Sequence, residues 1–168
     1  MEAVVYTSNT GSTEHYAKLL GHELRVSVYS TEEAGNKLPT GTEIIYLGWI
    51  MAGKIQRFGL ARKKYKICAV CAVGMGQTGT QRKEIREKNN IPGKIPVFTL
   101  QGNFSVERLH GMYKMMMNIM VKTAGKALEK KTDRTPEEED MLDMMLHGGE
   151  RVKIQNLQSV ISWYNGKR

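Results

Sequence analysis

The sequence predicts a single α/β domain spanning residues 1–168, with a five-stranded parallel sheet covered by helices on both faces. Two observations indicate this doubly wound arrangement. Most of the regularly spaced strand candidates are continuous apolar runs, as expected for strands buried on both faces. Helical patterns alternate with these runs. The expected strands are 2–7, 25–29, 43–47, 66–73 and 95–100, and the expected helices between them are 13–23, 55–62 and 80–88. The length suits one compact domain with a sizeable core.

Beyond the last strand the chain turns at 101–103 and is predicted to be helical for the remainder. Thr135 followed by Pro136 and acidic residues is typical of a helix start, and Gly148-Gly149 ends that helix. Asn156 is expected to cap a final helix. We expect the lysine-rich link at 125–134 to be a mobile loop.

The segment 109–121 forms a predicted helix that is rich in methionine. A narrow polar stripe, with residues four apart, interrupts it at His110, Lys114, Asn118 and Lys122. One interpretation is a helix buried on two sides, by the sheet and by the C-terminal helices. The other is a docking surface on which adaptable methionines meet a hydrophobic partner, a quinone or a bilayer.

A hydroxyl-rich turn joins the first strand to the first helix: Ser8, Asn9, Thr10, Gly11, Ser12 and Thr13. Backbone amides, hydroxyls and the positive end of a helix dipole converge at such a turn, which is what a phosphate monoester requires. The alternative is an ordinary helix cap with spare hydroxyls. The lysine that closes a nucleotide triphosphate loop is absent, and so is a GxGxxG pattern.

The two cysteines, Cys68 and Cys71, fall within one apolar strand. Residues three apart on a strand point to opposite faces, so this pair cannot clasp a metal. We therefore expect no metal site, and we expect both cysteines to be small core residues in a reducing compartment.

The net charge of +8 is concentrated in one window of the chain, because 44–83 contains eight basic residues and no acidic residue. The window could be an ordinary solvated surface. It also contains the loops at 48–53 and 74–79. If these loops surround a redox group, positive charge would favour the addition of electrons to that group.

The turn at 8–13 matches a T/S-x-T/S-G-x-T pattern after the first strand, and in this the chain resembles the flavodoxins. The resemblance implies that FMN is the cofactor and that 8–13 holds its phosphate. It also implies that the loops after the third and fourth strands flank the flavin ring, with Trp49 stacking on it and the backbone of Gly48 and Gly53 near its N5 atom. The flavin-flanking residues implied are Gly48, Trp49, Ile50, Met51, Gly53, Gly74, Met75, Gly76 and Gln77. Flavodoxins usually carry an acid where this chain has Gln77.

The basic segment after 48–53 and the long helix with methionines also resemble the menaquinone-dependent protoporphyrinogen oxidase branch of flavodoxin-domain proteins. This implies a quinone or an anionic porphyrin as small-molecule substrate or redox partner. The first functional hypothesis is an FMN oxidoreductase that passes electrons from a reduced organic substrate to a quinone or similar acceptor. The second is a non-catalytic electron carrier that docks on an acidic partner.

No catalytic acid–base pair is indicated, and the three histidines at 15, 22 and 147 are interpreted as surface residues. The basic window contains no recognisable nucleic-acid-binding motif, so no nucleic-acid partner is expected. Met1 runs almost directly into the first strand with no visible secretory leader, which favours a cytoplasmic location, with peripheral contact at the inner face of the membrane as a further expectation.

Overall fold

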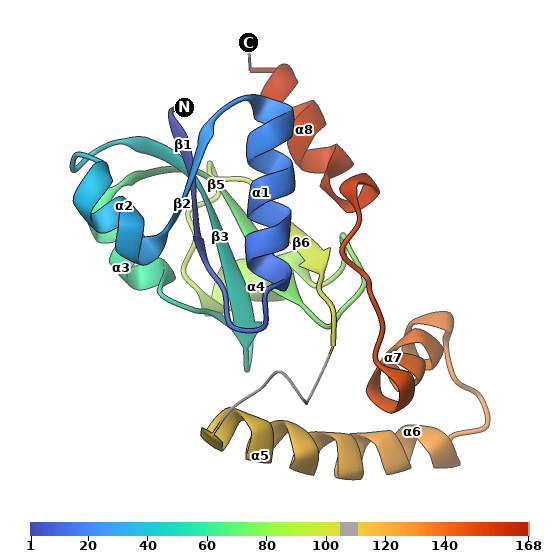
Figure 1. Cartoon of the computed structure of the whole chain (residues 1–168). Helices are drawn as coiled ribbons and strands as arrows, with labels where there is room; N and C mark the ends of the chain where they lie inside the picture. The colour runs from blue at the N-terminus through green and yellow to red at the C-terminus, as the bar shows by residue number, and fades with distance from the viewer. Residues whose placement is uncertain (105–110, 168) are drawn as a thin grey trace.

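A computed structural model describes residues 1–104 and 111–167. Its sheet contains β1 (Ala3–Thr7), β2 (Ser27–Ser30), β3 (Glu43–Met51), β5 (Lys66–Gly74) and β6 (Val97–Gln101). These strands are all parallel and lie in the order β2-β1-β3-β5-β6 (Figure 1). The predicted fold class is confirmed. The order reverses between β1 and β3, which makes the gap beyond their carboxyl ends the topological switch point.

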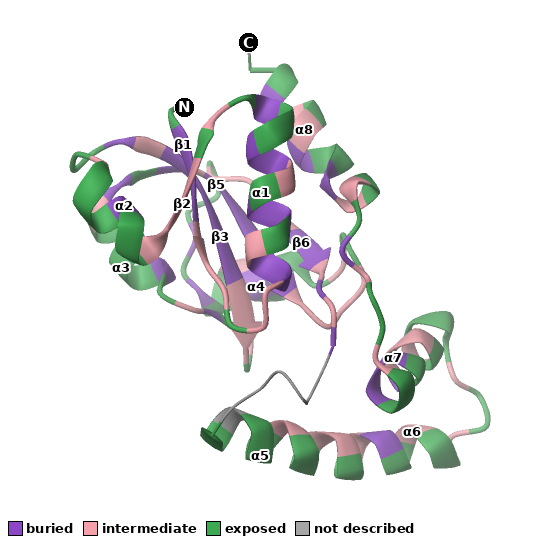
Figure 2. Ribbon diagram, in the orientation of Figure 1, coloured by how far each residue is buried: buried purple, intermediate pink, exposed green. Residues whose placement is uncertain are grey.

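Helices cover both faces of this sheet, and most residues of the central strands are buried (Figure 2). On one face the side chains of α1 (Ser12–Leu24) and α8 (Gln158–Asn165) form a core with alternate strand residues such as Val4 and Leu47. On the other face α2 (Thr31–Lys37), α3 (Phe58–Lys64) and α4 (Arg82–Lys88) cover the intervening strand residues, including Val5 and Tyr46.

Two elements between β2 and α3 differ from the sequence-based expectation. The sequence analysis missed α2, although Ser30 and Glu33 form a capping box at its start. The helix expected at 55–62 begins only at Phe58, because β3 first turns back into a short antiparallel strand, β4 (Lys54–Ile55). The two turn residues, Ala52 and Gly53, both have positive φ, the geometry of a two-residue hairpin turn.

The C-terminal region adds a helical arm to the sheet domain. α5 (Gly111–Met120) continues through a π-helical turn (Val121–Gly125) into α6 (Lys126–Lys130), and α7 (Pro136–His147) follows. In Figure 1 the α5–α6 helix lies apart from the sheet domain, and α7 packs on α6. The expected mobile loop at 125–134 is therefore wrong over its first half, which is helical; only 131–135 connects the two helices.

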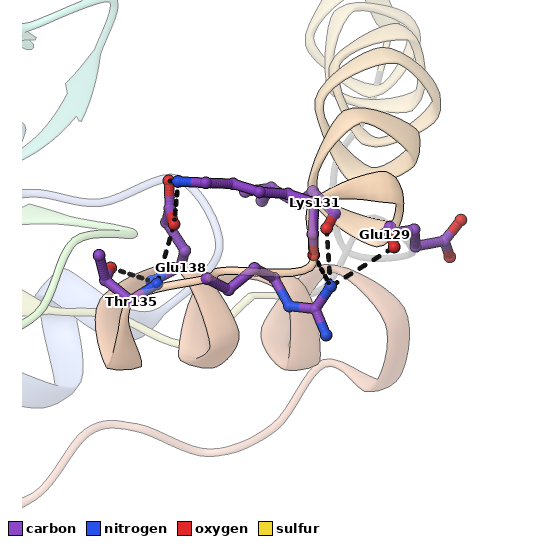
Figure 3. A network of polar contacts seen from close by, with 6 residues as sticks. Glu129, Lys131, Thr135 and Glu138 are labelled. Carbon is purple, nitrogen blue, oxygen red and sulfur yellow. Dashed lines mark hydrogen bonds and ion pairs between the residues drawn. The ribbon is translucent and has the colours of Figure 1, made fainter.

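Polar contacts hold the turn between α6 and α7 (Figure 3). The Lys131 ammonium donates to both Glu138 carboxylate oxygens at 2.8 and 2.7 Å, and Glu138 also completes a capping box with Thr135. The Arg134 guanidinium donates to the carbonyls of Leu128 and Lys131. The predicted start of α7 at Thr135-Pro136 and its end at Gly148 are confirmed.

The last helix begins differently from the prediction. A 3₁₀ turn (Ile154–Leu157) precedes α8, and Leu157 is the residue at the cap position. The Asn156 side chain instead donates to the Tyr16 hydroxyl and to the Arg151 carbonyl, which ties the C-terminal segment to α1. Asn156 is therefore a tertiary contact and does not cap α8.

Cys71 is fully buried in the core, and burial raises the pKa of its thiol. Cys68 is only half-buried and lies where the pairing of β3 with β5 skips one residue. The core position expected for both cysteines thus holds for Cys71 alone. Within 1–104 and 111–167, no group of side chains is suited to hold a metal ion. In the same ranges no helix has the length and apolar character needed to cross a bilayer.

Candidate functional site

Four loops leave the sheet at about the same level. Thr7 pairs with Gly48, Trp49 pairs with Val73, and Gly74 pairs with Gln101. Because all of these strands are parallel, the loops that follow β1, β3, β5 and β6 meet at the carboxyl edge of the sheet, where open α/β sheets bind ligands.

The loop after β1 forms an open cradle at the start of α1. Gly11 has a φ of 98° at the N-cap, and its amide donates to the Ser8 hydroxyl at 3.2 Å. The first helical hydrogen bond runs from the His15 amide to the Gly11 carbonyl, so the amides of residues 12–14 precede the first intrahelical donor and point out of the start of the helix. A Cβ added at Gly11 would meet nothing within 4 Å. An anion therefore has both donors and space here.

A cavity of about 220 Å³ lies where the loops meet. Four of its lining residues come from the cradle, and others come from the loops after β3, β5 and β6 and from α5. In chain order they are Asn9, Thr10, Ser12, Thr13, Trp49, Ile50, Met51, Ala52, Val73, Gly74, Met75, Gly102, Asn103, Phe104, Met116, Met117 and Met120.

Most of the predicted site residues are brought together in this cavity. Nine of the predicted residues line it: Asn9, Thr10, Ser12, Thr13, Trp49, Ile50, Met51, Gly74 and Met75. Ser8 instead lines a second cavity, which shares Asn9 and Trp49 with the first. Trp49 therefore forms a wall between the two cavities, next to the cradle. The remaining predicted residues, Gly11, Gly48, Gly53, Gly76 and Gln77, lie outside the lining of either cavity.

Two of the predicted glycines have packing reasons for lacking a side chain. Gly48 is buried within the sheet, where an added Cβ would lie 2.5 Å from Ile55 Cγ2. Gly53 occupies a positive-φ position of the hairpin turn, and an added Cβ would lie 2.5 Å from Lys88 Cδ. The absence of a side chain at Gly48 and Gly53 thus allows the 48–53 loop to adopt its observed path. The expected approach of their backbone to a flavin N5 atom stays a prediction.

Asn89 holds this hairpin in place, and the sequence analysis missed it. The Asn89 side chain is buried at the end of α4; it donates to the Gly53 carbonyl and accepts from the Ile55 amide, both at 2.8 Å. It also donates to the Ile85 carbonyl. No local pattern marks this role of Asn89, because its two partners in the hairpin, Gly53 and Ile55, lie more than thirty residues away.

The turn after β6 also forms part of the wall of the main cavity, through Gly102 and Asn103. From the sequence, residues 101–103 were expected only to form a turn. An added Cβ at Gly102 would lie 3.0 Å from Val73 Cγ1, so the backbone passes close to β5. The Asn103 amide donates to the Ser12 hydroxyl at 3.0 Å, and the Asn103 side-chain oxygen accepts from the Arg151 and Val152 amides. Asn103 thus links the cradle to the segment that leads into α8.

Charged side chains are not found among the described residues that line the main cavity. Lys63, Lys64 and Lys66 lie at the amino-terminal edge of the sheet, and β5, which runs from Lys66 to Gly74 in the cavity wall, is about 26 Å long at 3.3 Å per residue. Arg57 is paired with Glu32. These lysines therefore do not supply the positive charge expected around the ring loops, because strand direction carries them to the far edge of the sheet.

Fold and site together define an α/β protein with a phosphate-type cradle at a topological switch point. The family model described as flavodoxin domain matches residues 3–133. The chain therefore belongs to the flavodoxin domain family, whose members generally bind flavin, usually FMN. No curated protein and no solved structure shows a significant match to the chain.

Proposed function

We propose that this protein is an FMN-dependent oxidoreductase that passes electrons from a reduced organic substrate to a quinone or similar acceptor. The observation that carries the proposal is the single cavity that joins the cradle to the loops after β3 and β5. FMN, when bound, supplies the two-electron chemistry. The protein's own residues bind the phosphate, position the ring and exclude water.

The cradle fits a phosphate monoester. Residues 12–14 offer amides at the positive end of α1, and Thr10 and Thr13 line the cavity with hydroxyl-bearing side chains. The positive φ of Gly11 turns the chain into the helix without a side chain over the opening. Trp49, which lies beside both the cradle and the main cavity, is the aromatic side chain suited to stacking on a planar ring.

The lining favours a neutral, apolar acceptor. Beyond the cradle the described lining is mainly apolar, with Ile50, Val73, Phe104 and the methionines of α5. A quinone ring suits such a surface, whereas an anionic porphyrin would meet no cationic side chain among the described lining residues. Of the two substrates that the resemblance to the menaquinone-dependent protoporphyrinogen oxidase branch implied, the lining therefore favours the quinone over the porphyrin.

A non-catalytic electron carrier is the second candidate. The exposed Arg82 and Lys83 at the start of α4 follow the loop that leaves β5, so a basic surface lies near that edge of the sheet. An acidic redox partner would be attracted to it.

Single-turnover kinetics separate the two candidates. The purified protein is loaded with FMN, reduced chemically, and mixed with a water-soluble quinone analogue under anaerobic conditions. The reoxidation rate of an oxidoreductase saturates with quinone concentration, and Met117→Gln, in the cavity wall, raises the half-saturating quinone concentration more than Met112→Gln, which lies outside it. A carrier shows slow, unsaturable reoxidation that is the same in both variants. Failure of the apoprotein to take up FMN contradicts both candidates.

A further inference from the structure

The α5 helix exposes an apolar face that nothing in the described chain covers. Met112, Met115, Met116 and Ile119 are 68%, 59%, 45% and 55% exposed. Their spacing of three, four and seven residues places them on one side of the helix. The helix is therefore not buried on two sides, as one interpretation of the sequence expected. Of the docking segment expected at 109–121, residues 109 and 110 lie outside the described residues.

The same helix presents a different side to the cavity. Met117 and Met120 line the cavity and are partly buried, and Met116 lies at the boundary because it both lines the cavity and is exposed. The exposed face is thus a separate surface from the cavity wall, and Met112 and Ile119 belong to it alone. This separation allows the face to be altered without touching the cavity.

The charge around this face is positive. Lys114, Lys122 and Lys126 are exposed, and residues 111–128 contain no aspartate or glutamate. On a helical projection the polar stripe of Lys114, Asn118 and Lys122 borders the apolar face on the side of Met115. An apolar face with a basic border is the pattern of a helix that lies in the interface of an anionic bilayer, because methionines and isoleucine enter the acyl boundary while lysines reach the headgroups.

We propose that α5 docks on the surface of an anionic lipid bilayer, with Met112, Met115, Met116 and Ile119 in the interface and the lysines on the headgroups. The helix lies along the surface, since no described helix is suited to cross a membrane. This goes beyond the proposed function, because binding of α5 to a bilayer does not require FMN. If both hold, α5 lies between the cavity, which Met117 and Met120 line, and the bilayer interface, where a lipid-soluble acceptor is found.

Vesicle flotation of the full-length protein tests the proposal. Phosphatidylcholine vesicles with and without phosphatidylglycerol are compared at low and high salt, with and without FMN. We expect binding that requires the anionic lipid, weakens with salt and persists without FMN. Failure of FMN uptake would therefore leave this result intact, and failure of vesicle binding would leave FMN uptake intact.

Matched variants locate the binding surface. Met112→Gln with Ile119→Gln should weaken vesicle binding at least about tenfold, because two side chains no longer enter the interface. Leu60→Gln, which alters a 61% exposed side chain on α3, should leave it unchanged. Lys114→Gln with Lys122→Gln should weaken it similarly, whereas Lys63→Gln with Lys83→Gln should not. Circular dichroism verifies that each variant keeps its helix content.

Three outcomes overturn the proposal. The first is a parent protein that stays unbound with anionic vesicles. The second is a set of α5 variants that bind as the parent does. The third is a parent that self-associates in sedimentation velocity without binding vesicles, together with a monomeric Met112→Gln, Ile119→Gln variant, which would assign the face to a second copy of the chain.

Discussion

The Ser12 hydroxyl accepts a hydrogen bond from the Asn103 amide at 3.0 Å, which joins the first helical residue of the cradle to the turn after β6. The Asn103 side chain in turn accepts from the Arg151 and Val152 amides. One asparagine therefore connects three segments that lie far apart in the sequence.

Asn103→Ala should destabilise the fold by roughly 1–3 kcal/mol, because the Arg151 and Val152 amides lose their acceptor. Urea unfolding measures the change. Asn118→Ala, at an exposed position on α5, is the matched control and should leave stability nearly unchanged. Equal stability of the two variants would show that water replaces the Asn103 side chain at no cost.

Asn89→Asp should disturb the hairpin between β3 and β4. The carboxylate keeps an acceptor for the Ile55 amide but places a negative charge against the Gly53 and Ile85 carbonyls, where the amide had donated. We expect a loss of roughly 1–3 kcal/mol in the free energy of unfolding and weaker binding of both FMN and riboflavin, because the ring wall moves. Asn36→Asp, exposed on α2, controls for the added charge. Unchanged flavin affinity in Asn89→Asp would exclude a positioning role.

Gly11→Ala should cost about 1–2 kcal/mol of stability, since a non-glycine residue is strained at positive φ. The added methyl meets nothing within 4 Å in the protein, so packing adds no further penalty. Gly59→Ala on α3 also adds a methyl to open space, but at a helical position it should stabilise by up to about 1 kcal/mol. Thermal unfolding of both variants checks the opposite signs. Two shifts of the same sign would contradict the assigned backbone geometry.

Glu138 makes the α6–α7 turn sensitive to acid. Its hydrogen bonds from Lys131 and the Thr135 amide lower the carboxyl pKa below the ordinary value of about 4.3. A lowered pKa in the folded state stabilises the protein above the unfolded pKa, and this stabilisation disappears as the pH falls through the folded pKa. Glu138→Gln should therefore lose stability at pH 6 and differ less from the parent at pH 3. Glu137→Gln, which alters an exposed neighbour, should have the stability of the parent at both pH values.

The sequence predicts the strands and the cradle well because their signals are local. Apolar runs mark buried strands, and the order of hydroxyls and glycine at 8–13 marks the start of α1. The hairpin at Ala52-Gly53 was missed because alanine rarely adopts positive φ. Asn89, Asn103 and Asn156 have their roles through distant partners, which local patterns do not show.

The methionine helix illustrates a different limit. Its apolar pattern is visible in the sequence, but whether the sheet, the C-terminal helices or something else covers that pattern depends on where the chain places the helix. The structure puts Met117 and Met120 against the cavity and leaves Met112 and Ile119 exposed. Periodicity shows which residues share one face of a helix, but it does not show what packs against that face.

The most direct test of the central claim compares FMN with riboflavin, which lacks the phosphate, in the parent and in Thr10→Val with Thr13→Val. Fluorescence quenching measures both dissociation constants. Hydrogen bonds to a charged group contribute about 1.5–3 kcal/mol each, so the double variant should bind FMN at least about tenfold more weakly while its riboflavin affinity stays the same. A double variant that binds FMN as tightly as the parent, or a parent that binds riboflavin as tightly as FMN, would contradict a phosphate site at residues 8–13.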